Sequence, residues 1–564
     1  MSGAVCRIVT AAMLLTTGPC LVGWCLAAPP TLTRIYPAGG QRGSEVVVEL
    51  SGEFDWPANV WAPGLNVTPE SDKGKLRVKI PADLPTDRAW LRVYSTQGAS
   101  SMLPLLIGDL EELAETEPNN TVKQAQEVKP SGVTVNGVLQ ENGDVDTFAV
   151  QLESGQTLVA ALDANTRLGS PMDAILQLVT ADGRVVAENH DAVGLDPRLV
   201  YRAPAAGRYL VRVFAYPAQP DTTFVMRGGA NYVYRLTVTA GPYITHAVPM
   251  TLDRPEQSPV RVAGWNVPDG TRLPMIGLSS PEGEPTAAAR EFDGAGSFQY
   301  PGSARLGFVA APEYGGAARV WSTPGMASVV AGESDDPLSA PVAVTGCIGE
   351  KRGRWAGQVK MAAGRAVEFS VDAQQVGSLL VPGLRVWDPA GKLVAESSVD
   401  GPRQDVSLTV TPESDGEYRV ELTDRFGGGG DGCFFRLVMR GVEPDYGLTV
   451  AADSWVLESG KELELEVKVA RRSDPGASIG AVTISAEGLP EGVVATPVVS
   501  EATGPTAEKV MLKLSASAGT SFSGPIRLRG TGGNDGALVR YARGPVQLGA
   551  TFDMFWLIVP VAAK

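Results

Sequence analysis

Short segments in which apolar and polar residues alternate run through most of the chain. Examples are EVVVELS at 45–51, TFAVQLE at 147–153 and RYLVRVFAY at 208–216. This period of two turns one face of a strand toward a core, and clusters of Gly, Pro, Asp and Asn between the segments mark turns. The pattern predicts antiparallel β-sandwiches. Only the stretches 109–117 and 284–292 have the spacing of a short helical turn.

The segments recur in the same order along the chain. SGQTLVAALDA, LGSPMDAILQLVTADGRVVAE and AAGRYLVRVFAY reappear as AGRAVEFSVDA, VGSLLVPGLRVWDPAGKLVAE and SDGEYRVELTD. A weaker pair, LTRIYPAGGQRGSEVVVELSG and ITHAVPMTLDRPEQSPVRVAGWNV, precedes each copy. Repeats of this length indicate duplicated structural units. We therefore expect two tandem pairs of β-domains and a fifth β-rich unit from about Tyr446 onward.

The first 28 residues are expected to be a secretory signal peptide. They contain one cation, Arg7, and no acid, and an apolar run ends in small residues before Pro29. No later run reaches the roughly 20 apolar residues that span a bilayer. The expected location is secreted, periplasmic or cell-surface, without a membrane span.

The net charge and the cysteines bear on the expected partners and on a possible disulfide. The 564 residues carry a formal net charge of −15, and an acidic chain repels phosphate backbones, so nucleic acid is not expected as a partner. Cys347 and Cys433 remain once the signal peptide is removed. In an oxidising compartment we expect them to form a disulfide, with two separate buried thiols as the alternative.

The first long copy carries the motifs of a known family in that family's order. These motifs are ETEPNNT, ENGDVDTF, SPMDAILQLVTADGRVVAE, AAGRYLVRVFAY and YRLTV. Over about 115–239 the chain resembles the bacterial pre-peptidase C-terminal domain, and 333–440 resembles it in degraded form. The unit before each copy resembles a TIG-type immunoglobulin-like domain. The combination resembles planctomycete-type secreted multidomain proteins.

These resemblances imply an all-β chain of tandem β-sandwiches, jelly-roll-like and immunoglobulin-like. The expected domains are a signal peptide at 1–28, a TIG/immunoglobulin-like domain at 29–108, a pre-peptidase-like sandwich at 109–240, a divergent TIG/immunoglobulin-like domain at 241–332, a degenerate pre-peptidase-like sandwich at 333–442 and an immunoglobulin-like sandwich at 443–564. No recognisable peptidase domain accompanies them.

The heptad ETEPNNT concentrates oxygen ligands just before the first long copy. Glu115, Glu117 and Asn119 stand at alternate positions, so an extended backbone places them on one side, and Pro118 restrains Glu117 to that conformation. Calcium takes six to eight such oxygens in a loose geometry. The alternative is a solvated linker rich in turn formers.

The family resemblance implies a calcium site. Its residues here would be Glu115, Glu117, Asn119, Asn120, Asp144, Asp146 and Tyr234. Tyr232 lies on the same strand face as Tyr234, so the tyrosine stays open, as does the role of one of the two aspartates. The second copy reads EKRGRWAGQV where the first reads ENGDVDTFAV, has Phe435 for the tyrosine and keeps only Glu333, Asp335 and Asp336 upstream. No cation site is expected in the second copy, where the disulfide would take the place of the metal ion as the stabilising cross-link.

Catalytic patterns are absent from the sequence. It holds no G-x-S-x-G elbow and no H-E-x-x-H helix, and its two histidines are His190, in a turn, and His246, in a strand segment. Zinc would need more His and Cys ligands. A further oxygen-rich group, Asp173, Asn189, Asp191 and Asp196, is interpreted as Asx-turns that close hairpins. We do not expect an enzyme.

The expected function is that of a non-catalytic binding or adhesion protein. Its partner would be an extracellular polymer, such as a polysaccharide or matrix protein, or an envelope protein. Aromatic residues suit such a face, and the best candidate loop contains Phe54, Trp56 and Trp61, with packing into the core as the alternative. The other hypotheses are a structural spacer without a ligand and an accessory part of a secreted hydrolase system, such as a peptidase system.

Overall fold

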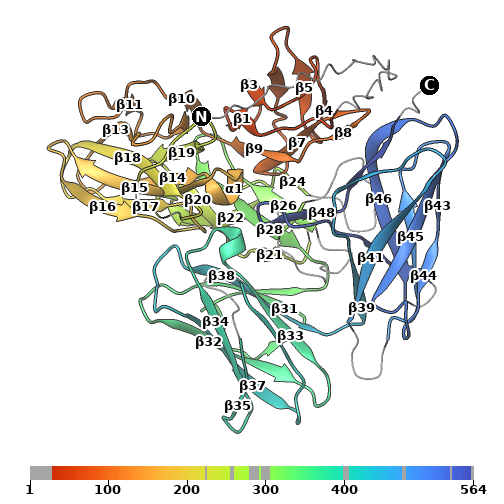
Figure 1. Ribbon diagram of the computed structural model, residues 1–564. Helices are drawn as coiled ribbons and strands as arrows, with labels where there is room; N and C mark the ends of the chain where they lie inside the picture. The colour runs from red at the N-terminus through yellow and green to blue at the C-terminus, as the bar shows by residue number, and fades with distance from the viewer. Residues whose placement is uncertain are drawn as a thin grey trace, which may run out of the picture.

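The computed structural model describes residues 28–220, 222, 225–254, 259–278, 291–293, 305–397, 405–472, 478–533 and 536–560. Strands make up nearly all regular structure in these residues, which confirms the predicted all-β class (Figure 1). No helix among them is long and apolar enough to cross a membrane. The predicted signal peptide, except Ala28, lies outside the described residues, as does most of 284–292.

The first sandwich covers residues 34–108. Its strands are β1 (Arg34–Tyr36), β2 (Gly39–Gln41), β3 (Glu45–Ser51), β4 (Asn59–Trp61), β5 (Asn66–Pro69), β6 (Lys75–Lys79), β7 (Arg88–Ser95), β8 (Gly98–Ala99) and β9 (Leu103–Gly108). The sheets have the orders β1-β3-β6-β5 and β2-β9-β7-β4, and β8 pairs with β7. Alternation in β3 and β6 points Val48, Leu50, Leu76 and Val78 into the core between the two sheets.

The second sandwich covers residues 111–239. Its elements are β10 (Glu111–Ala114), β11 (Gln126–Val128), β12 (Val133–Val138), β13 (Asp146–Leu152), β14 (Thr157–Asp163), α1 (Asn165–Leu168), β15 (Met172–Thr180), β16 (Val185–Asn189), β17 (Arg198–Arg202), β18 (Gly207–Pro217) and β19 (Val233–Thr239). The sheet orders are β10-β12-β19-β14-β17 and β11-β13-β18-β15-β16. The predicted helical turn at 109–117 was wrong, because β10 pairs in parallel with β12.

The fourth sandwich, residues 327–441, repeats this topology. Its elements are β29 (Ala327–Val330), β30 (Leu338–Ser339), β31 (Val342–Cys347), β32 (Arg354–Met361), β33 (Val367–Asp372), the 3₁₀ turn η2 (Gln374–Val376), β34 (Pro382–Trp387), β35 (Leu393–Glu396), β36 (Ser407–Val410), β37 (Gly416–Asp424) and β38 (Phe434–Gly441). The sheet orders are β29-β31-β38-β33-β36 and β30-β32-β37-β34-β35. Strand for strand, they match the second sandwich.

The third sandwich, residues 243–322, lies between these two. Its strands are β20 (Tyr243–Ala247), β21 (Thr251–Leu252), β22 (Val260–Trp265), β23 (Arg272–Leu273), β24 (Gly277–Leu278), β26 (Arg305–Val309), β27 (Gly315–Gly316) and β28 (Ala318–Ser322), with β25 (Glu291–Asp293) pairing elsewhere. The sheet orders are β23-β22-β20-β27 and β21-β28-β26-β24. Ile244, Val262, Val309 and Val320 form its core.

The last sandwich covers residues 445–559. Its strands are β39 (Asp445–Thr449), β40 (Ser454–Val456), β41 (Glu462–Arg472), β42 (Val482–Glu487), β43 (Val493–Thr496), β44 (Val498–Ser500), β45 (Lys509–Ala516), β46 (Phe522–Gly532), β47 (Leu538–Tyr541), β48 (Ala550–Phe552) and β49 (Phe555–Val559). The sheet orders are β39-β41-β45-β43 and β40-β49-β46-β42-β44, and β47 pairs with β46.

An arginine in the last strand of each long sandwich contacts the sandwich before it. Arg235 of β19 forms an ion pair with Glu112 and fits against Gly39 of β2, where a Cβ would lie 2.4 Å from Arg235 Nε. At the same register position of β38, Arg436 lies over the ring of Trp321, 4.3 Å from its centroid, and donates to Thr251 of β21. The two junctions are therefore built alike.

The third sandwich also contacts each of its other neighbours. Asn266 Nδ2 donates to the Thr157 carbonyl of the second sandwich at 2.8 Å. Arg319 reaches Asp87 of the first sandwich at 3.8 Å. Strand β25 pairs with β48 of the last sandwich, which Figure 1 shows beside the third. The third sandwich therefore holds the arrangement together.

The last sandwich packs against the first. The contacts include Trp61 against Trp556 with ring centroids 5.9 Å apart, Trp90 against Phe552 at 5.0 Å, and Arg92 to Asp453 at 2.7 Å. Aromatic pairs of this kind contribute about 0.5–1.5 kcal/mol beyond their burial. The domains thus form a closed assembly and not an extended string.

We predict that Trp61→Ala loosens this closing contact. Removal of the indole should weaken the contact by about 1 kcal/mol or more, increase the radius of gyration in small-angle X-ray scattering and speed amide exchange in β49. Trp56→Ala is the matched control, because Trp56 donates to Glu70 within the first sandwich. An unchanged radius and unchanged exchange in Trp61→Ala would contradict the closed assembly.

Candidate functional site

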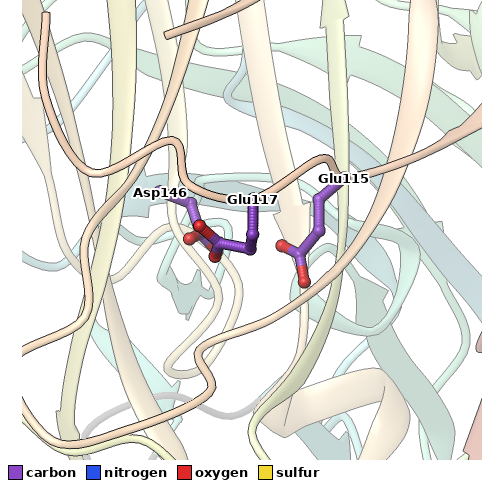
Figure 2. A group of neighbouring side chains, drawn as sticks. All are labelled: Glu115, Glu117 and Asp146. Carbon is purple, nitrogen blue, oxygen red and sulfur yellow. The ribbon is translucent and has the colours of Figure 1, made fainter. Parts of the chain in front are cut away.

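Three carboxylates from two chain segments meet in the second sandwich. Glu115 follows β10, Glu117 lies in the next loop, and Asp146 begins β13. One oxygen of each lies within 4.8 Å of the others, and Figure 2 shows the three side chains pointing toward one another. Asp146 is buried, Glu115 is half-buried and Glu117 is exposed. We call these residues the carboxylate cluster.

Tyr234 contacts the cluster from β19. Its hydroxyl donates to Asp146 Oδ2 at 2.5 Å and lies 3.1 Å from Glu115 Oε2. The other oxygen of Glu115 accepts the Val138 amide at 2.8 Å. The structure therefore places Tyr234, and not Tyr232, at the cluster.

A glycine makes room for the tyrosine ring. Gly137 stands opposite Tyr234 in the sheet. A Cβ at Gly137 would lie 2.2 Å from Tyr234 Cζ and 2.5 Å from Glu115 Oε2, closer than atoms can approach. Sequence reasoning missed this residue. The repeat offered a signal, because VNGV corresponds to VTGC, where Gly346 stands opposite Phe435.

Two buried polar groups at the cluster have no partner. The backbone amide of Asn119 donates to Glu117 Oε2 at 2.9 Å. Its side chain is fully buried, and among the described residues neither of its polar atoms has a hydrogen-bond partner; the same holds for Asp146 Oδ1. Each unsatisfied group costs about 1–3 kcal/mol. A bound water or ion is one way in which such buried atoms are satisfied.

Asp144 and Asn120 lie beside the cluster but bond to each other. Asn120 Nδ2 donates to Asp144 Oδ1 at 3.1 Å. The amides of Gln140 and Val145 donate to the same carboxylate at 2.6 and 2.9 Å. These three bonds fix the Asp144 side chain in the loop before β13. The structure brings Asp146, and not Asp144, to the other two acids.

Burial and repulsion raise the pKa values in the cluster. Burial raises the pKa of Glu115 to about 7. Burial, and then the charge of Glu115, raise the pKa of Asp146 to about 9. Burial also raises the pKa of Glu117. A hard divalent cation fits this set of oxygens, because it would displace the protons and offset the repulsion.

The fourth sandwich has an apolar cluster at the same register positions. Glu115, Asp146 and Tyr234 correspond to Ala331, Trp355 and Phe435. The rings of Trp355 and Phe435 lie 6.0 Å apart, and all three side chains belong to or pack against the core of that sandwich. None of them offers an oxygen ligand. Glu333, which corresponds to Glu117, instead forms an ion pair with Arg261 at 3.3 Å.

The predicted disulfide is wrong, because both cysteines are free thiols. Cys347 pairs with Phe434 across the sheet, and Ile348 donates to the carbonyl of Cys433. Successive residues of a strand point to opposite faces. Cys433 is therefore buried in the core, whereas Cys347 is exposed and its thiol lies 3.2 Å from the Gly430 carbonyl oxygen.

The second oxygen-rich group binds backbone amides. Asp196 accepts the Thr166 amide at the start of α1, and Asn189 accepts the Arg198 amide at 2.9 Å. These bonds join residues 30 and nine positions apart, whereas an Asx-turn bonds the amide two residues on, so they are not the predicted Asx-turns. Burial raises the pKa of Asp173 nearby.

The three aromatic residues proposed as a binding loop do not form one face. Phe54 and Trp56 lie 6.2 Å apart, and Phe54 packs against the core of the first sandwich. Trp56 donates to the Glu70 carbonyl at 2.9 Å. Trp61 contacts Trp556 of the last sandwich. The loop therefore belongs in part to a domain contact.

The histidines lie away from the cluster. His190 is exposed, and its Nε2 is 2.7 Å from Glu188. His246 is buried and stacks on Phe434 with centroids 4.3 Å apart. Burial lowers the pKa of His246 to about 4, so its imidazole is neutral at physiological pH.

The fold and the cluster define a tandem β-sandwich protein in which one unit carries a buried acidic site. Residues 144–215 match the family described as the bacterial pre-peptidase C-terminal domain. The second sandwich is thus a domain of this family, as its motifs indicated. The match begins at Asp144 and includes Asp146 of the cluster.

A probable subtilase-type serine protease of Deinococcus radiodurans is 31% identical to this chain over 106 residues. These are 19% of this chain, and the chain spans only 15% of that protease. A pre-peptidase C-terminal domain of a Bacillus anthracis collagenase covers 22% of this chain and all of its own, at 16% identity and a TM-score of 0.16. The M60 catalytic domain with two CBM51 domains from Clostridium perfringens ZmpB covers 74% of this chain and 46% of its own, at 10% identity and a TM-score of 0.15.

We predict that Asp146→Asn changes the pH dependence of stability of the cation-free protein. Raised carboxyl pKa values stabilise the fold below the unfolded values near 4, and this contribution is lost as pH rises through about 7 and about 9. In the presence of chelator, the free energy of unfolding of Asp146→Asn should therefore exceed that of wild type by on the order of 2 kcal/mol at pH 8. At pH 4 the two values should differ little. Thermal unfolding across this range measures the difference. The exposed Glu153→Gln is the control, and an unchanged pH slope in Asp146→Asn would contradict the prediction.

Proposed function

We propose that this chain is a non-catalytic, secreted or cell-surface binding or adhesion protein whose second sandwich is stabilised by calcium. The carboxylate cluster with its unpartnered buried atoms is the observation that carries the proposal. The sandwiches would present loops to an extracellular polymer or an envelope protein.

Calcium suits the cluster because it accepts carboxylate, amide and other oxygen ligands in an irregular arrangement. Glu115, Glu117 and Asp146 would supply the charge, and the unpartnered side-chain oxygen of Asn119 would add a neutral ligand. The ion would hold the loop after β10 against the start of β13. That loop lies beside the first junction, where the Tyr36 hydroxyl donates to the Asn136 carbonyl at 3.2 Å.

Three observations bear on the alternative functions. The segment shared with the subtilase-type protease supports an accessory role in a secreted peptidase system. The contact between the first and last sandwiches makes the chain more compact than a spacer requires. For catalysis, neither histidine lies at the cluster, and His246 is buried under Phe434. We therefore propose a protein without catalytic activity.

Calcium should raise the melting temperature of the protein relative to chelator. At 100 times the dissociation constant, the ion adds roughly 2.7 kcal/mol of stability. Glu117→Gln should reduce the shift and Asp146→Asn should abolish it. Glu333→Gln, the corresponding residue of the fourth sandwich, is the matched control and should keep the full shift. Coincident wild-type melting curves with calcium and with chelator would rule out the site.

The binding role predicts retention on an extracellular polymer without turnover. The purified protein is passed over cellulose, chitin and gelatin and is incubated with casein, gelatin and polysaccharides. We expect retention on at least one support and no hydrolysis products. If the loop that contains Trp56 binds the polymer, Trp56→Ala should weaken retention on the support. Trp56→Phe should keep most of the retention, because the aromatic contact remains. Hydrolysis would contradict the non-catalytic role, and no retention on any support would favour the spacer.

A further inference from the structure

One side chain of the first sandwich reaches the backbone that holds the carboxylate cluster. Tyr36 ends β1, and its hydroxyl donates to the Asn136 carbonyl of β12 at 3.2 Å. The backbone amide of Glu115 donates to the same carbonyl at 3.0 Å. A residue of the cluster and a residue of the neighbouring sandwich therefore share one acceptor.

The ring of Tyr36 lies beside a second group that holds Glu115. It packs against a small apolar group formed by Ala38, Val138 and Val233. The backbone amide of Val138 donates to Glu115 Oε1 at 2.8 Å. Burial, and then the charge of Glu115, raise the pKa of Tyr36 to about 12, so its hydroxyl keeps the proton that it donates. The backbone and the carboxylate of Glu115 are thus both held by residues that Tyr36 contacts.

The same two strands carry the arginine of the first junction. Asn136 and Arg235 are cross-strand partners in β12 and β19. Asn136 Nδ2 donates to Glu112 at 2.6 Å, and Glu112 forms the ion pair with Arg235. Tyr234 of the cluster precedes Arg235 in β19. Because adjacent residues serve the junction and the cluster, displacement of the first sandwich would disturb the contacts that hold the cluster.

The junction between the third and fourth sandwiches differs in both features. Gly39 contacts the arginine of the first junction, and Thr251 contacts the arginine of the second. Three residues before these positions stand Tyr36 and Val248. Valine has no hydroxyl, and in the fourth sandwich apolar side chains replace two of the carboxylates. The tyrosine hydroxyl therefore occurs at the junction whose long sandwich carries the cluster.

We propose that Tyr36 is a positioning residue of the cation site, and that docking of the first sandwich and binding of a divalent cation by the carboxylate cluster strengthen each other. The hydroxyl of Tyr36 holds the β12 backbone that anchors Glu115, which keeps the carboxylate directed toward the other two acids (Figure 2). The coupling rests on the proposed calcium site and is reciprocal. The factor by which docking raises cation affinity is the factor by which the cation strengthens docking.

Calorimetric titration of the full chain with calcium chloride tests this coupling. Tyr36→Phe removes the hydroxyl and keeps the ring, and loss of one hydrogen bond should weaken calcium affinity about threefold to tenfold. Tyr209→Phe is the matched control, because the Tyr209 hydroxyl donates to the Ala205 carbonyl at 2.9 Å within the second sandwich. It should bind calcium as wild type does. Equal affinity in Tyr36→Phe and wild type would overturn the coupling and leave the proposed function standing, whereas a wild-type protein that binds no calcium would overturn both.

Hydrogen exchange measures the reciprocal effect on the junction. Calcium should slow amide exchange at residues 36–41 of the wild-type protein by about threefold or more relative to chelator. Strand β5, at the opposite edge of the sheet from β1, is the internal control and should change little. The slowing should be smaller in Tyr36→Phe and absent in Asp146→Asn. This measurement on wild type decides the question even if Tyr36→Phe does not fold, because equal exchange at 36–41 with calcium and with chelator, in a protein that binds calcium, would overturn the coupling.

Discussion

A buried arginine at the junction between each short sandwich and the long sandwich that follows is the contact on which the rest of the structure depends. Arg235 and Arg436 occupy the same register position in the two long sandwiches. Removing one partner of a buried ion pair costs about 3–5 kcal/mol, because the other charge stays buried. The first and second sandwiches therefore form one pair, and the third and fourth form another. The third sandwich also contacts the first, the second and the last, and so connects the two pairs with the last sandwich.

The two long sandwiches show how one fold carries opposite chemistry at one position. In the second, Asp146 and Tyr234 bring buried polar oxygens together, and their burial is unfavourable without protons or a cation. In the fourth, Trp355 and Phe435 fill the same place with apolar surface. The glycine opposite the ring, Gly137 or Gly346, is present in both, because either ring needs its space.

Sequence reasoning reached the parts of this structure that depend on local pattern. Alternation predicted the strands, and the repeat with its motifs predicted the segments of the carboxylate cluster. Sequence reasoning wrongly assigned residues 111–114 to a helical turn. Their strand conformation depends on parallel pairing with β12, which is a non-local contact that local spacing does not reveal. The disulfide between Cys347 and Cys433 failed because spacing did not reveal that the two side chains face opposite sides of the sheet. Trp61 looked like a surface residue because its contact, Trp556, lies almost 500 residues away.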